Sequence, residues 1–155
     1  MAEVARRCGG RTIIVDSTFA TPYHQTLLDR GAHLVVHSAT KGLCGHGDAV
    51  GGAVVGDAER VRRVREEGVR TAGGALSPLN AMLLARGVRT VSVRMELASR
   101  SAAELARRLQ GDPRVARVHY PGLTDHPGHA VAADQMRDGF GALLAFEVEG
   151  GRAAG

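Results

Sequence analysis

The 155-residue sequence has no tryptophan, and aromatic side chains make up only 3% of it. Proteins that bind single-stranded nucleic acid by stacking bases need such rings. The sequence has few of them, which argues against that function. The two cysteines, Cys8 and Cys44, are too few for a disulfide framework or a zinc quartet. We expect no signal peptide, and the longest apolar runs are far too short to cross a bilayer. We therefore expect a cytoplasmic protein with neither membrane nor nucleic-acid partners.

The composition is otherwise that of a folded protein. Hydrophobic residues make up 44% and charged residues 23% of the chain, both near globular averages. The length allows one domain with a real core, or pieces of two. The net charge of +4 comes mostly from arginines mixed with glutamates, as in "ERVRRVREEGVR". This mixture is typical of a solvated helix face and not of a nucleic-acid-binding stripe.

The first part of the chain predicts parallel strands joined by helices. Residues 12–15 form a short, β-branched apolar run, which is typical of a strand buried on both faces of a parallel sheet. A second strand is expected near residues 34–36, and a third, weakened by glycine, within residues 49–56. Between the first two, the sequence predicts a helix that begins near Pro22, includes Leu27 and Leu28, and ends at Gly31.

Helices dominate the middle of the chain, and a smaller β-α-β unit follows. The segment "AERVRRVREEG" predicts a helix that ends at Gly68. Another helix is expected to begin at about Pro78 and to be interrupted near Gly87. A longer helix follows, with Leu97, Leu105 and Leu109 on its apolar face, and it is closed by residues 111–113. The segments "RVARVHYPG", "GHAVAADQMRD" and "GALLAFEVEG" predict a strand, a short helix and a strand. A domain boundary near residue 90 is expected.

Polar residues follow two of the predicted strands at their carboxyl ends. Asp16 follows the first strand, and Ser38, Thr40 and Lys41 follow the second. In open α/β sheets, functional groups gather at this edge. We therefore expect these four side chains to share a site.

Four chemistries could explain the glycine-rich stretch "HSATKGLCGHGDAVGG" around Lys41. A Walker phosphate loop fails because its glycines precede the lysine. A dinucleotide fingerprint fails because Val50 stands where "GHGDAV" would need its third glycine. A metal site could use His37, His46, Asp48 and Cys44, but no recognised ligand spacing appears, so we expect no metal. His46 and Asp48 suit structural support of the loop better.

The fourth chemistry is a lysine Schiff base with pyridoxal 5′-phosphate (PLP). It needs a lysine held at a strand end, small neighbours that admit the ring, hydroxyls for the phosphate, and a carboxylate that keeps the pyridine nitrogen protonated. The stretch from Asp16 to Lys41 has all four. The alternative for the hydroxyls of Ser38 and Thr40 is that they bond nearby backbone groups, but the phosphate role is the one we expect.

Two motifs, "DSTFATP" and "HSATK", occur in this order, followed by "GGALSPLNAMLLARGVRTVSVRM", "HYPGL" and "GALLAFEVEGG". In these the chain resembles the cysteine/methionine-metabolism family of PLP enzymes, which includes cystathionine γ-synthase, cystathionine γ-lyase and methionine γ-lyase. The resemblance implies an α/β protein of PLP-dependent transferase fold type I, the aspartate-aminotransferase-like fold. Residues 1–90 would be the C-terminal part of the PLP-binding large domain. Residues 91–155 would be the linking helix and the start of the small domain.

The resemblance also implies roles for individual residues. Lys41 matches the lysine that bonds to PLP and then acts as general acid and base. Asp16 matches the carboxylate on the pyridine nitrogen. Ser38 and Thr40 match hydroxyls that contact the phosphate, and Thr18 matches a threonine beside the ring.

Two residues depart from the pattern of the family. Ser17 stands where the family commonly has asparagine, and Gly42 stands where it commonly has an aromatic residue. Glycine after the lysine reduces packing and stiffness at the site. The resemblance implies that the chain corresponds to the middle of the enzyme, and we expect it to be without the upstream phosphate loop and the downstream carboxylate-binding arginine. We therefore expect exposed apolar surface and missing strand neighbours.

The function implied by the resemblance is γ-elimination on a sulfur amino acid by a carbon–sulfur lyase of the methionine γ-lyase or cystathionine γ-lyase type. The alternatives are γ-replacement of the cystathionine γ-synthase type and a truncated, non-catalytic remnant. An intact small α/β binding module is a third possibility. The family implies a homotetramer built from dimers that share active sites.

Overall fold

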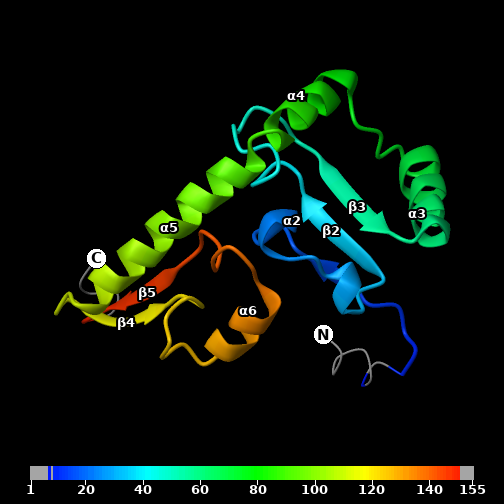
Figure 1. Ribbon diagram of the computed structural model, residues 1–155. Helices are drawn as coiled ribbons and strands as arrows, with labels where there is room; N and C mark the ends of the chain where they lie inside the picture. Colours follow the sequence, from blue (N-terminus) through cyan, green and yellow to red (C-terminus); the bar gives the residue numbers. More distant parts are fainter. Residues whose placement is uncertain (1–6, 8, 151–155) are drawn as a thin grey trace. The chain divides into compact units, whose positions relative to one another are not determined.

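The computed structural model describes residues 7 and 9–150, so Cys8 lies outside the described residues (Figure 1). The chain divides into two compact units. The first comprises the residues up to Pro22 together with Thr26–Val91, and the second comprises Tyr23–Gln25 together with the residues from Ser92 onward. The assignment of the two units to a cofactor domain and a small domain remains a prediction.

The first unit contains a three-stranded sheet of order β1-β2-β3, made of β1 (Ile14–Asp16), β2 (Leu34–Ser38) and β3 (Gly52–Gly56) (Figure 1). Strands β1 and β2 are parallel, as predicted, with Asp16 opposite Val36. The prediction is wrong for β3, which pairs antiparallel with β2. The connecting loop contains no helix, and a parallel pair would need a longer crossover connection, usually with a helix.

Strand β1 is only partly buried. Ile13, just before the strand, is buried, but Ile14 is 59% exposed. One face of the sheet is covered by a cluster of Leu27, Ala32 and Val35 to which Val15 is added. Because side chains alternate along a strand, Ile14 points to the opposite face of the sheet, where its own side chain is not covered. The prediction of burial on both faces is therefore wrong for Ile14.

The helix predicted between the first two strands is broken into two short elements. They are α2 (Thr21–His24) and a 3₁₀ turn, η1 (Leu28–Arg30). The turn ends at Gly31, as predicted, and Gly31 has a φ of 93° that favours glycine. The interruption follows from Tyr23–Gln25 belonging to the second unit, where the His24 carbonyl accepts a hydrogen bond from the Arg137 backbone N–H at 2.9 Å.

Two further helical segments follow β3. Helix α3 (Ala58–Val64) begins after Asp57, whose carboxylate accepts the Arg60 backbone N–H at 2.9 Å. It continues directly into a π-helix, η2 (Arg65–Thr71), so the predicted end at Gly68 is wrong. Helix α4 (Pro78–Val88) begins where predicted, with Ser77 as its N-cap and proline in its first turn.

Helix α4 packs against the loop that follows β2. A buried cluster joins Ala39, Leu43, Cys44 and Ala49 of the loop to Leu84 of the helix. At Gly87 the helix approaches so closely that a β-carbon would collide with the Cys44 carbonyl oxygen and would lie 2.9 Å from the carbonyl carbon of Cys44. Helix α4 therefore supports the loop that contains Lys41.

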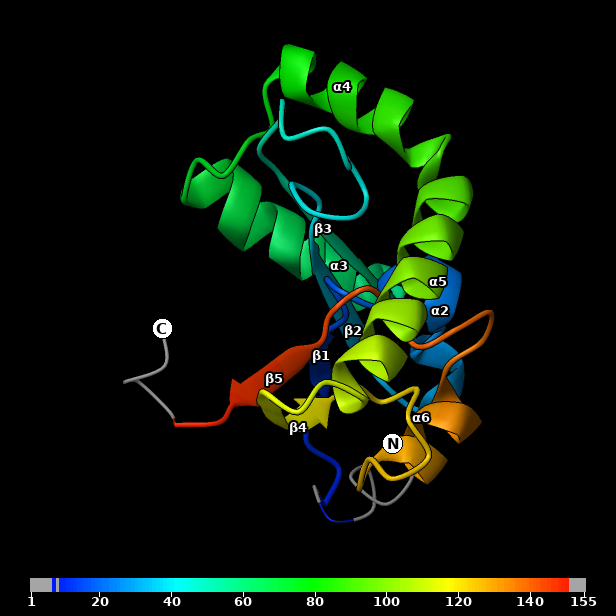
Figure 2. The same cartoon turned by 90° about the vertical axis from the view of Figure 1, so that its left-hand side faces the viewer.

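The second unit contains α5 (Val91–Gln110), β4 (Val115–His119), α6 (His129–Gln135) and β5 (Ala145–Val148). Strands β4 and β5 lie side by side and antiparallel, with an irregularity between Val115 and Arg117 (Figure 2). None of the helices in the described part of the chain combines the length and apolar character needed to cross a membrane.

The buried face of α5 differs from the predicted one. Leu97 and Leu105 are 58% and 49% exposed. The buried positions are instead Met95, Ser99, Ala102 and Ala106. Three of these four residues are small, which makes room for the ring of Tyr120, and the Tyr120 hydroxyl donates to the Gly141 carbonyl at 3.0 Å. Sequence periodicity favoured the large leucines, whereas packing against a ring needs small residues.

The contact at Gly87 leads to a stability prediction. Gly87→Ala should destabilise the chain by about 1–3 kcal/mol through overpacking, although alanine is the better helix former. The matched control is Gly68→Ala, where a β-carbon meets nothing within 4 Å and a gain of up to about 1 kcal/mol is expected. Urea unfolding of both variants measures this, and equal effects of the two substitutions would contradict the packing argument.

Candidate active site

The carboxyl ends of β1 and β2 are joined beyond their last paired residues. The Ser17 backbone N–H donates to the Val36 carbonyl at 3.0 Å, and the Ser38 backbone N–H donates to the Thr18 hydroxyl at 2.8 Å. Asp16 ends the first strand and Ser38 ends the second. The structure therefore brings the segments of Asp16, Thr18 and Ser38 together at one edge of the sheet.

His37 fixes the same edge from the buried side. Its ring is 6% exposed, and its Nδ1 lies 3.1 Å from the Ser17 carbonyl oxygen. A carbonyl oxygen can only accept, so Nδ1 is the donor. The Thr21 backbone N–H donates to the same oxygen at 3.0 Å, and Thr21 has a φ of 58°, which is unusual for a β-branched residue.

Sequence reasoning missed this role of His37, which it considered only as a metal ligand. The signal was its strand position. His37 lies one residue before Ser38, so its side chain points to the opposite face of the sheet from that of Ser38.

Asp16 is exposed and held in its charged form. The Thr18 hydroxyl and then the Thr18 backbone N–H, which lies 2.8 Å from Oδ1, lower the pKa of Asp16 below its ordinary value of 3.8. A smaller electrostatic contribution from the nearby His37 lowers the pKa of Asp16 further. The carboxylate at this edge is therefore ionised at neutral pH.

Lys41 lies in a hydrogen-bonded turn after β2, and its side chain is exposed. Its backbone N–H donates to the Ser38 carbonyl at 3.1 Å, and its own carbonyl accepts the Gly45 N–H at 2.8 Å. The Cys44 N–H donates to the Ala39 carbonyl at 2.9 Å, so both sides of the turn are tied. Backbone hydrogen bonds thus position the lysine while its side chain is left in solvent.

The two hydroxyl residues differ in their surroundings. Ser38 is half-buried at the end of β2. The Thr40 hydroxyl accepts the Gly51 N–H at 3.0 Å and lies 3.4 Å from the Gly51 carbonyl. Thr40 thus closes the two ends of the loop that contains Lys41, and a contact of its hydroxyl with a phosphate remains a prediction.

Cys44, His46 and Asp48 support the loop. The buried Cys44 thiol donates to Asp48 Oδ1 at 3.2 Å, and His46 Nδ1 lies 2.6 Å from the Cys44 carbonyl oxygen. Within the described residues, no three His, Cys, Asp or Glu side chains gather as a metal site would require.

The residues at this edge fit a phosphorylated pyridine aldehyde. Such a group needs an amine, an ionised carboxylate for its ring nitrogen, and hydrogen-bond donors. Lys41 and Asp16 supply the first two. Ser17 Oγ is buried, and it has no hydrogen-bond partner among the described residues. An unsatisfied buried hydroxyl next to Asp16 is a further group that a bound molecule could satisfy.

Comparison with solved structures defines the class of protein. Cystathionine gamma synthase from Xanthomonas oryzae pv. oryzae matches with a TM-score of 0.91 and 45% identity, over 98% of this chain and 39% of that one. CalE6, a methionine gamma lyase from Micromonospora echinospora, matches with a TM-score of 0.92 and 42% identity, over 99% of this chain and 42% of that one. The fold is PLP-dependent fold type I, as predicted.

The chain belongs to the Cys/Met metabolism PLP-dependent enzyme family, whose profile matches residues 1–155. It is 46% identical to L-methionine gamma-lyase of Pseudomonas putida, over 100% of this chain and 39% of that protein. It is 41% identical to cystathionine gamma-lyase of Bacillus subtilis, over 96% of this chain and 38% of that protein. The chain thus spans about two fifths of the length of these relatives. The predicted family and cofactor class are confirmed, and the individual residue roles stay predictions.

The hydrogen bonds of Thr18 lead to a prediction for pH titration. Thr18→Val removes the hydroxyl, so the pKa of Asp16 should rise toward 3.8, as followed by the carbon-13 shift of its carboxyl. Thr18 stabilises the charged form, so its stabilising contribution is present above the unfolded pKa and is lost as pH falls through the lowered folded pKa. Thr18→Ser keeps the hydroxyl and should leave the titration unchanged. An unchanged titration in Thr18→Val would contradict the assignment.

Proposed function

We propose that the chain is part of a PLP-dependent carbon–sulfur lyase that eliminates the γ-substituent of a sulfur amino acid, as methionine and cystathionine γ-lyases do. The observation that supports this most is the placement of an exposed lysine and an ionised aspartate at one edge of the sheet, in a member of this family. We also propose a cytoplasmic location and assembly into a homotetramer of active-site-sharing dimers.

Each side chain at the strand-end site would have a separate role. Lys41 would hold the cofactor through its amine and, once displaced by the substrate, would move protons at the substrate α- and β-carbons. Asp16 would pair with the ring nitrogen and keep it protonated, with Thr18 keeping Asp16 ionised. Ser38 and Thr40 would face the phosphate. The bound cofactor supplies an electron sink for the negative charge that develops at the α-carbon.

Replacement of the γ-substituent is the second candidate function. O-succinylhomoserine sulfhydrylase of Pseudomonas aeruginosa is 44% identical over 99% of this chain and 38% of that protein. Both reactions begin with loss of the α-proton, so Lys41 and Asp16 would serve either one. A non-catalytic remnant is the remaining alternative, and the departures at Ser17 and Gly42 are the features that favour it.

The test of the proposal uses the fact that Lys41 is the only lysine in the sequence. The chain is mixed with PLP, its visible spectrum is recorded, and it is reduced with borohydride before peptide mapping. We expect a visible band and a stoichiometric label on the Lys41 peptide. Lys41→Arg should lose both, and the urea-unfolded chain measures the background on Lys41 and on the α-amino group. A label no greater than that background would overturn the proposal in favour of the remnant.

Asp16 has a separate test. Asp16→Asn removes the charge with little change in shape, so cofactor attachment to Lys41 should persist while the electron sink weakens. Exchange of the α-proton of L-methionine in heavy water, followed by proton NMR on the loaded chain, should slow by about 10²-fold or more. Exchange at the unchanged rate would remove Asp16 from the proposed role.

A further inference from the structure

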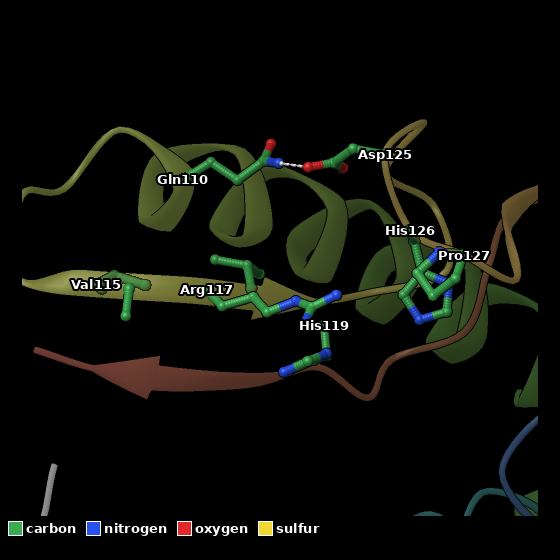
Figure 3. A pocket seen from close by; sticks show the side chains of 9 residues that line it. Gln110, Val115, Arg117, His119, Asp125, His126 and Pro127 are labelled. Atoms are coloured by element: carbon green, nitrogen blue, oxygen red, sulfur yellow. Dashed lines mark hydrogen bonds between the residues drawn. The ribbon is translucent and has the colours of Figure 1, made fainter.

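The second unit contains a cavity of about 250 Å³, and none of its lining residues belongs to the strand-end site (Figure 3). It lies along β4 and is lined by Val115–His119, by Gln110 at the end of α5, and by the loop residues Asp125, His126 and Pro127. Drug-sized ligands occupy about 300–1,000 Å³, so this cavity suits a smaller molecule.

Arg117 supplies a positive charge to this cavity without a carboxylate partner. Its partner across the two strands is Glu147, but Glu147 Oε1 is taken by His119 Nε2 at 2.6 Å. The Arg117 side chain runs along β4 toward the side of the cavity where His126 lies, whereas His119 turns toward β5 (Figure 3). Within the described residues, no ion pair involves Arg117.

His126 adds a ring N–H donor on the same wall. Its Nδ1 accepts the Gly128 backbone N–H at 3.0 Å, so the proton of the neutral ring is on Nε2. The ring is half-buried and lines the cavity. Arg117 and His126 together offer N–H groups suited to a carboxylate, since charge-assisted hydrogen bonds of this kind are the strong ones.

Asp125 supplies the opposite charge. Its carboxylate accepts a hydrogen bond from the Gln110 amide at 3.0 Å, which ties the loop to the end of α5 (Figure 3). The described residues hold no ion pair between Asp125 and Arg117, although both line the cavity. A cavity lined by a positive and a negative group that do not pair with each other is complementary to a ligand bearing both charges.

We propose that this cavity binds a small α-amino acid as its zwitterion. The ligand carboxylate would lie against Arg117 and His126, and its ammonium group against Asp125. Val115, Ala116 and Pro127 provide apolar surface for the side chain of the ligand. The inference rests on the residues of the second unit alone and does not depend on the function proposed above.

The test is a titration of the PLP-free, nitrogen-15-labelled chain followed by NMR. The probes are L-methionine, L-methionine methyl ester, which keeps only the ammonium charge, and N-acetyl-L-methionine, which keeps only the carboxylate. We expect L-methionine to give saturable shifts of the Arg117 side-chain N–H and the Gly128 amide. Each blocked compound should bind about tenfold more weakly or worse, because one charged contact is lost.

Variants assign the two charges. Arg117→Gln should weaken L-methionine binding about tenfold but leave binding of the methyl ester unaffected. Asp125→Asn should weaken L-methionine binding to a similar extent but leave binding of N-acetyl-L-methionine unaffected. The matched control is Arg107→Gln on α5, an exposed arginine paired with Glu104 and outside the cavity. Because Arg117 and Asp125 are both exposed, the variants should keep the dispersed spectrum of the parent chain.

The inference would be overturned by any of the following results. They are the absence of saturable shifts around the cavity, equally tight binding of N-acetyl-L-methionine, and equal weakening by Arg107→Gln. Shifts confined to Asp16 and Ser38 would also overturn it, since they would report the strand-end site. Failure of the proposed function appears as a missing label on Lys41, so the two failures are distinguishable.

Discussion

The hydrogen bond from the Ser38 backbone N–H to the Thr18 hydroxyl is the contact on which the candidate site depends. It continues the pairing of β1 and β2 past the point where their ladder stops, using a side chain in place of a carbonyl. The same threonine lowers the pKa of Asp16. One residue therefore sets both the spacing of the two strand ends and the charge of the carboxylate between them.

Much of this edge could be predicted from the sequence, because short-range rules determine it. The apolar run at residues 12–15 and Gly31 after η1 locate the strand and the turn end, and Asp16 and Lys41 then follow at strand ends. Long-range packing was not predictable in the same way. The direction of β3, the continuation of α3 through Gly68 and the exposure of Ile14 depend on which elements meet, and local sequence does not specify that.

The second unit shows the same division between local and long-range information. The order of strand, helix and strand was predicted correctly, whereas the buried face of α5 was not, because Tyr120 selects small residues over leucines. The cavity beside β4 has no sequence signature at all. Arg117 has no ion-pair partner there because the glutamate opposite it bonds to His119, and no spacing along the chain reveals such a choice between partners.

The close approach of Gly87 to Cys44 has a consequence for how variants of this protein would be interpreted. The loop with Lys41 rests on α4 at a point where the helix must present no side chain. A bulkier residue there would displace the lysine without touching any reacting group. In a screen for inactive variants, a substitution of Gly87 would give the same result as a substitution of a reacting residue. Only a stability measurement would separate the two kinds of variant.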